Sequence, residues 1–345
     1  MSDAPSLAVF DPHPLTLVDK ALVWGALLAA GYLFLTVGWT AMRPDDPLGA
    51  VSLLSRRGAL MMVLQAGALA AVAAALGTVL AGRKLVDVGS FAASVGVTVA
   101  TFRGASIEPL LLAHANSGGS PRGLGVLLAV EAVCWLVVAV LVLLVSGLVM
   151  RWCFDPGRRA PTPGPDGGHT LSVDPTHDAR ILAAYDLGAI LPLPLGGTGY
   201  ARTPLGDGVR HMLITAFAAV VAFNIVATGW SARSIQHGQV CFIVAASICA
   251  GCYVAHRMVP VKSALWGVFA AGLVAVAGYV WAAARPGGAS ELAAVPASNF
   301  LRILPIQCVF VGTASAIAML WYMHLPEEDP VGSDSAAGAA RSGGS

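Results

Sequence analysis

The sequence predicts an all-α, polytopic integral membrane protein, and three observations support this fold class. Hydrophobic residues make up 57% of the 345 residues and charged residues only 11%, against about 25% charged residues in soluble domains. The mean hydropathy is +0.75. Apolar segments recur along the chain, most of them close to 20 residues long. Because a helix needs about 20 residues to cross the hydrocarbon of a bilayer, we expect about eight transmembrane helices in two groups of four.

Eight apolar segments meet or approach this length. They are residues 21–42, 58–81, 88–102, 124–150, 212–230, 238–255, 264–284 and 303–323. The first segment is predicted to be a retained helix and not a signal peptide, because Lys20 is the only Lys or Arg before it. The expected environment of all eight segments is the lipid bilayer.

The predicted helices form an N-terminal half, residues 1–150, and a C-terminal half, residues 211–325. Between them, residues 151–210 form a loop rich in Pro and Gly, in which Asp174 and Pro175 predict the start of a short helix. Residues 326–345 have the composition of a disordered tail. The sequences TVGWTA and ATGWSA end the first and fifth helices. Either a duplication or the preference of Trp for membrane boundaries explains them.

The distribution of positive charge predicts the orientation. If the chain starts in the cytoplasm, that side holds 12 of the 20 Lys and Arg residues, and cytoplasmic loops are the more basic ones. We therefore expect an integral protein of the cell (inner) membrane with both termini cytoplasmic. A net charge of +1 argues against nucleic acid as a partner. The six cysteines lie mostly in apolar segments, which is not the pattern of a secreted disulfide framework.

Three charged residues, Arg103, Glu108 and Glu131, lie where the sequence is otherwise apolar. The third predicted helix has two possible ends. It stops near Phe102, with Arg103 at the membrane interface, or it continues to Leu112 and breaks at Glu108-Pro109. A broken helix with charges at the break is how many transporters build a binding site.

Glu131 lies inside the fourth predicted helix, where an ionisable group is costly and indicates a functional site by default. Arg103 is its natural partner. A buried pair of this kind either marks a path for an ion or substrate or fixes the packing of two helices. Gln65, Asn224 and Gln307 are polar residues within apolar segments, and we expect them to form hydrogen bonds between helices or to line a path.

The sixth predicted helix carries Cys249, Cys252 and His256, which share one narrow stripe with Cys241 at 100° per residue. Thiolate and imidazole groups bind soft metals, so these residues are candidate ligands. The alternative is ordinary packing by small residues, since CAGC is not followed by the histidine of a haem attachment motif. No cofactor is predicted.

Residues 86–105 resemble the second transmembrane segment of MotA-type stator proton-channel subunits. The matching positions are Asp87, Ser90, Gly96 and Thr98, which follow the acidic-x-x-Ser start and the Gly-x-Thr run of that segment. The resemblance covers about 20 residues and implies ion conduction. The chain departs from that family in having four predicted helices after its central loop.

No motif in the sequence identifies an enzymatic reaction. The first functional hypothesis is translocation of an ion or small solute, with Arg103, Glu108 and Glu131 along the path. The second is a non-catalytic subunit that anchors or assembles a larger membrane complex, with other protein subunits or further copies of the chain as partners. The third, based on Cys249, Cys252 and His256, is a metal- or haem-binding redox protein.

Overall fold

The computed structural model describes residues 17–82, 85, 87–154, 204–228, 235–261, 263–285 and 298–324. Within these residues every regular element is a helix, apart from an isolated β-bridge between Ala50 and Ala105. The predicted all-α class is confirmed. The short helix predicted at Asp174 and the predicted disordered tail lie outside the described residues.

In the described part of the chain, seven helical segments are long and apolar enough to cross a membrane. They are the continuous segment Leu17–Met42, formed by α1 (Leu17–Leu33), η1 (Phe34–Gly38) and α2 (Trp39–Met42), then α3 (Ala59–Ala81), α6 (Pro121–Phe154), α8 (Leu205–Ala227), α9 (His237–Met258), α10 (Leu265–Ala284) and α12 (Pro305–His324). An eighth apolar helix, α4 (Val88–Thr101), has only 14 residues. Each predicted segment corresponds to one of these helices. The protein is therefore a multi-pass membrane protein.

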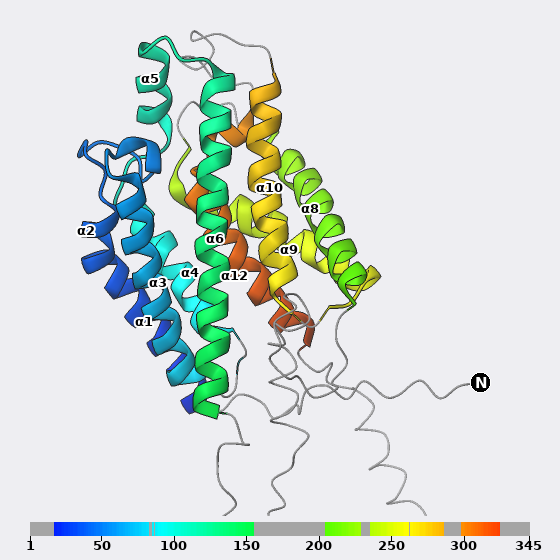
Figure 1. Cartoon of the computed structure of the whole chain (residues 1–345). Coiled ribbons are helices and arrows are strands. Elements are labelled where there is room, and N and C mark those ends of the chain that lie inside the picture. Colours follow the sequence, from blue (N-terminus) through cyan, green and yellow to red (C-terminus); the bar gives the residue numbers. More distant parts are fainter. Residues whose placement is uncertain are drawn as a thin grey trace, which may run out of the picture.

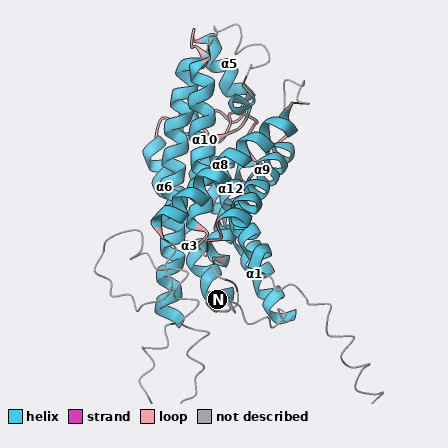
Figure 2. Ribbon diagram, turned by 90° about the vertical axis from the view of Figure 1, so that its right-hand side faces the viewer, coloured by secondary structure: helices cyan, strands magenta, loops and turns pink. Residues whose placement is uncertain are grey.

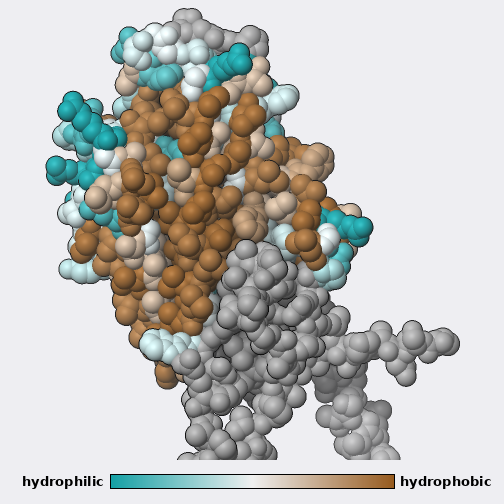
Figure 3. All heavy atoms as spheres, in the orientation of Figure 1, coloured by the Kyte–Doolittle hydropathy of each residue, from teal (hydrophilic) through white to brown (hydrophobic). Residues whose placement is uncertain are grey.

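The helices run in alternating directions through one bundle (Figures 1 and 2). We call the end at which α1 begins the proximal end, and the opposite end the distal end. The short helix α5 (Glu108–Asn116) stands at the distal end, beside the start of α6 (Figure 1). Figure 3 shows a broad apolar face over the long helices and hydrophilic residues gathered at the distal end. This is the surface expected of a bundle that is surrounded by lipid.

The contacts between the two halves follow a two-fold pattern. α6 packs on α10, α4 packs on α12, and α6 also packs on α12. Each helix has a counterpart in the other half: α4 corresponds to α10, and α6 corresponds to α12. Exchanging every helix with its counterpart leaves this set of contacts unchanged. Two repeats of the same orientation would produce such a pattern. Inside the halves the symmetry is incomplete, because α3 packs extensively along α4 whereas α9 and α10 have no contact of that size between their described residues.

The short helix α4 lies in the middle of the bundle, between α1, α3 and α12. Close approach to α3 depends on glycine, since a Cβ atom on Gly77 would lie 2.9 Å from the Cα of Gly89. At about 1.5 Å per residue, α4 is roughly 21 Å long, which is shorter than the hydrocarbon of a bilayer. The space beyond its last residue must therefore be filled by other segments.

Non-helical segments fill this space at the distal end. Residues 43–58, which include the short helix η2 (Leu53–Ser55), enter the bundle so that Ala50, Val51 and Ser52 are at most 1% exposed. The amide of Ala105 donates to the carbonyl of Gly49 over 3.1 Å. Non-helical backbone is tolerated in a membrane protein where other protein groups satisfy it. The distal end consequently gathers polar groups inside the bundle.

Candidate functional site

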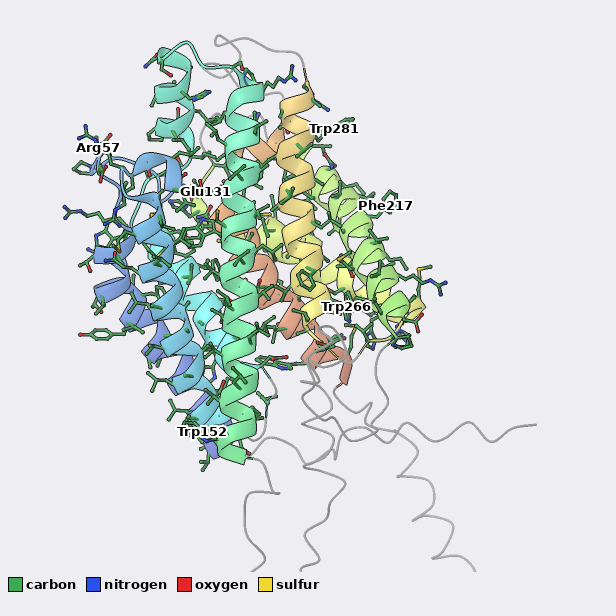
Figure 4. All side chains as sticks on the ribbon, in the orientation of Figure 1. Arg57, Glu131, Trp152, Phe217, Trp266 and Trp281 are labelled. Atoms are coloured by element: carbon green, nitrogen blue, oxygen red, sulfur yellow. The ribbon has the colours of Figure 1, made fainter. Side chains whose placement is uncertain are left out.

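Glu131 is the ionisable group at the centre of this distal region (Figure 4). It lies ten residues after the start of α6, and only 1% of its surface is exposed. Ser52 Oγ donates to Oε2 over 2.5 Å, and Trp135 Nε1 donates to Oε1 over 3.1 Å. The backbone amide of Leu53 also donates to the carboxyl group. Three donors from two separate segments therefore meet on this side chain.

The local sequence explains why these donors are placed there. Ser52 is the N-cap of η2 and its hydroxyl accepts a hydrogen bond from the amide of Leu54 over 3.2 Å, so its position is fixed by the turn. Trp135 lies one helical turn after Glu131 on the same face of α6. Its ring contacts Phe310 of α12 edge to face, with centroids 6.0 Å apart. Glu131 thereby fastens residues 52–53 to α6.

A second polar cluster joins the ends of α4, α9 and α12. Gln307 is 1% exposed, and its Nε2 donates to Thr101 Oγ1 over 3.0 Å and lies 2.7 Å from His237 Nδ1. His237 Nε2 lies 3.1 Å from the carbonyl oxygen of Gly104. The last residue of α4 and the first turns of α9 and α12 are thus connected by side chains.

The backbone around Gly104 connects the two clusters. A Cβ atom on Gly104 would lie 2.7 Å from Cγ2 of Val51, so this close approach requires glycine. Val51 immediately precedes the Ser52 that binds Glu131, and Gly104 carries the carbonyl that faces His237. We call the set of side chains that these segments bring together the polar layer: Ser52, Thr101, Glu131, His237 and Gln307.

Arg103 is not part of the polar layer, and the predicted pairing of Arg103 with Glu131 does not form. The guanidinium group donates to the carbonyl oxygen of Leu35 over 2.5 Å and lies over the ring of Trp39 at 5.0 Å. The physical reason is that α4 ends at Thr101, which turns the exposed Arg103 side chain toward η1 and α2 at the edge of the bundle. This is the interfacial position expected if the helix stops near Phe102.

The alternative in which the third helix continues to Leu112 is wrong. Residues 102–107 are not part of any helix, and α5 begins anew at Glu108, with Pro109 in its first turn. Proline is favoured at that position because the first amides of a helix need no intrahelical partner. Glu108 is half-buried at the start of α5, outside the long helices. Of the three charged residues selected from the sequence, only Glu131 lies inside the polar layer.

Sequence reasoning missed His237, Ser52 and Arg302. His237 directly precedes an apolar segment, where a histidine is typical of a helix boundary. Ser52 lies in a segment between two predicted helices. Arg302 belongs to the short helix η5 (Asn299–Arg302) and is only 6% exposed. Desolvation by burial lowers the pKa of its guanidinium from the ordinary value. Only the tertiary contacts reveal these three positions.

The polar residues within apolar segments have different roles. Gln307 forms the expected hydrogen bonds between helices. Asn224 instead donates to the carbonyl of Val220 in its own helix over 2.8 Å and faces outward, as Gln65 does. The expectation of interhelical bonds is therefore wrong for Asn224, because its side chain is on the face of α8 that points away from the bundle.

The candidate metal ligands on α9 do not form a binding site within the described residues. There, no group of three or more His, Cys, Asp or Glu side chains is arranged to hold a metal ion. Cys252 is buried, whereas the thiol of Cys249 lies 3.7 Å from the carbonyl of Ser315 on α12. His256 contacts His211 edge to face at 6.3 Å. The stripe therefore packs against two different neighbours, α12 and α8.

The positions that resemble the proton-channel segment lie along α4. Asp87 precedes the helix with φ of 64°, Ser90 is buried, and Gly96 is a position where a Cβ would meet Phe34 of η1. The resemblance itself stays a prediction. No protein-family model, curated protein or solved structure matches this chain.

Proposed function

We propose that the protein translocates an ion or small solute across the membrane and that Glu131 carries a proton during this process. The observation that supports the proposal is a carboxyl group that is 1% exposed within an apolar bundle and has no paired cation among the described residues. Carboxyl groups inside membrane helices are costly and mark ion pathways and proton relays. A proton is the simplest cation that such a group can bind.

The architecture around Glu131 supports the same proposal. Transporters commonly place their sites where helices are discontinuous and where two halves of the bundle meet. Here α4 ends at Thr101, α12 begins at Pro305, and non-helical residues 49–52 and 104–105 lie between the two polar clusters. The polar layer is therefore built from both halves of the chain, through Glu131 on one side and Gln307 on the other.

Proton flux into proteoliposomes tests the proposal. Vesicles that contain a trapped pH-sensitive dye receive a potassium gradient and valinomycin, and the resulting potential drives protons inward. We expect wild-type vesicles to acidify faster than protein-free vesicles and Glu131→Gln vesicles to acidify at the protein-free rate. Glutamine keeps the size of the side chain but removes the group that binds the proton.

Glu108→Gln is the matched control, because it changes the same functional group in α5, outside the polar layer. It should retain wild-type flux. Equal rates for wild-type and protein-free vesicles, or full flux in Glu131→Gln, would overturn the proposal. Size-exclusion chromatography of each variant establishes that a loss of flux is not a loss of fold, and Glu131→Asp provides a second variant that retains a carboxyl group.

A second function is favoured by the way in which Glu131 is bound. Two of its donors, the hydroxyl of Ser52 and the amide of Leu53, fasten residues 52–53 to α6, and the third, Trp135, holds the carboxyl group in place. A non-catalytic subunit that anchors or assembles a larger membrane complex needs such fixed contacts between its segments but no path for an ion or solute. This alternative predicts stable partner proteins after gentle detergent extraction. Native mass spectrometry that shows the chain purifying alone would contradict it.

A further inference from the structure

His237 holds its two ring nitrogens in different surroundings. Nε2 lies 3.1 Å from the carbonyl oxygen of Gly104, which can only accept a hydrogen bond, so Nε2 carries a proton. Nδ1 lies 2.7 Å from Nε2 of Gln307, which is a donor, so Nδ1 presents its lone pair. The contacts therefore select one neutral tautomer and leave Nδ1 as the position at which a further proton can bind.

We propose that Nδ1 of His237 is a second proton-binding site of the polar layer. When Nδ1 binds a proton, the Gln307 side chain rearranges to accept a hydrogen bond from it. When Nδ1 is protonated, it faces the Gln307 amide nitrogen as a second donor. Rotation of the Gln307 amide by half a turn places Oε1 there instead. The imidazolium group is then held by two acceptors, the Gly104 carbonyl and Gln307 Oε1, without any change in the backbone.

The contacts of Gln307 with His237 and Thr101 are hydrogen bonds in both states. In the neutral state Gln307 Nε2 donates to Thr101 Oγ1, and the Thr101 hydroxyl donates to the carbonyl of Thr98 over 2.6 Å. After rotation, Oε1 of Gln307 faces the hydroxyl of Thr101, which turns its proton from Thr98 to that oxygen. One proton is bound at Nδ1, one amide rotates and one hydroxyl turns, and no covalent bond other than the new N–H is formed.

The surroundings of His237 suit a group that changes charge. The ring of Phe102 stacks on the imidazole at 5.7 Å with 29° between the planes, and an aromatic face attracts a cation. Among the described residues, the ionisable side chains near His237 along the surrounding segments are Cys241 one turn further on α9, Arg103 after α4, Arg302 before α12 and Cys308 on α12. Arg103 is directed to Leu35 and Trp39. Within the polar layer, Glu131 is the other ionisable group.

The transport role of this site rests on the proposed function, whereas proton binding itself does not. Histidine ¹⁵N signals of the full-length protein in lipid vesicles provide the test, because they distinguish protonated from unprotonated ring nitrogens. Loss of one set of signals in His237→Asn assigns that set. We expect the assigned residue to be the Nε2–H tautomer at high pH and to become doubly protonated as the pH falls.

Gln307→Glu sharpens the test. A carboxylate beside Nδ1 favours the imidazolium, so the ratio of doubly protonated to neutral His237 at a fixed pH should rise about tenfold. His211→Asn, at the proximal end, should leave the ratio unchanged. An Nδ1–H tautomer at high pH, a neutral ring throughout the pH range in which the protein is folded, or an unchanged ratio in Gln307→Glu would overturn the inference. This experiment does not measure flux. A failure of Glu131→Gln to reduce proton flux would overturn the proposed function and leave the inference about His237 unaffected.

Discussion

The distal and proximal ends of the bundle differ in how side chains connect their helices. At the distal end α4 ends and α12 begins inside the protein. The side chains of the polar layer connect segments there that are far apart in the sequence. At the proximal end α3 and α9 end and α4, α8 and α10 begin, and fewer side-chain hydrogen bonds join the described segments there. There, His211 Nδ1 donates one hydrogen bond to the carbonyl of Val259 over 2.9 Å, and Thr78 and Ser146 pair their hydroxyls over 2.6 Å.

The difference teaches where polar groups are needed in an apolar bundle. A continuous helix satisfies its own backbone, so its neighbours can be alanine and glycine. Where a helix stops inside the protein, its last carbonyls and the first amides of the next segment need partners. Ionisable and amide side chains then become necessary for structure and, at the same time, available for function. Four predictions test this contrast, from the largest expected effect to the smallest.

Glu131→Leu should have the largest effect on stability. The substitution leaves the hydroxyl of Ser52, the indole N–H of Trp135 and the amide of Leu53 without their acceptor, and buried unsatisfied donors cost about 1 to 3 kcal/mol each. We expect the free energy of unfolding in mild detergent to fall by about 3 kcal/mol. Denaturant titration followed by tryptophan fluorescence measures it. A loss below about 1 kcal/mol would show that the distal loop does not depend on Glu131.

Gly104→Val should weaken the junction of the two polar clusters. The added side chain collides with Val51, and overpacking costs about 1 to 3 kcal/mol. We expect a loss of about 2 kcal/mol in the same titration. Gly25→Val is the control, because nothing lies within 4 Å of a Cβ atom at Gly25. Similar losses in both variants would remove the distinction between the junction and an open face of α1.

Gln307→Leu should cost more than the hydroxyl variant Thr78→Val. Leucine removes two hydrogen bonds and leaves His237 Nδ1 without its donor, for which we expect about 1.5 kcal/mol. Thr78→Val removes one interhelical bond at the proximal end, and such bonds average about 0.6 kcal/mol in a membrane protein. Equal effects in the denaturant titration would contradict the view that the distal end depends more on its polar contacts.

Cys249→Ala should have the smallest effect. The thiol makes one long contact, with the carbonyl of Ser315, so we expect a change within about 0.5 kcal/mol, as for a substitution without a specific role. Treatment of the wild-type protein with a strong metal chelator should also leave the melting temperature unchanged. A chelator-induced fall that Cys249→Ala abolishes would restore the metal-binding hypothesis for α9.

The sequence predicted much of the fold and identified one ionisable residue of the polar layer, Glu131. Eight apolar segments were located because hydrophobic length along the chain is a local property. Glu131 was found for the same reason, since a charge within an apolar segment is visible in the sequence. Gln307 was noticed as polar, but its partners Thr101 and His237 were not. They lie on α4 and α9, and neither helix directly precedes α12 in the chain.

The sequence by itself determined the membrane class, the helices and the anomaly at Glu131, because each depends on the composition of a single segment. Only the tertiary structure decided that Arg103 contacts Leu35 and Trp39 and that Ser52, from a segment without any apolar pattern, binds Glu131. The physical reason is that burial of a carboxyl group is compensated by whichever donors the fold brings within reach. That choice depends on where α4 stops, and so on the packing of the whole bundle.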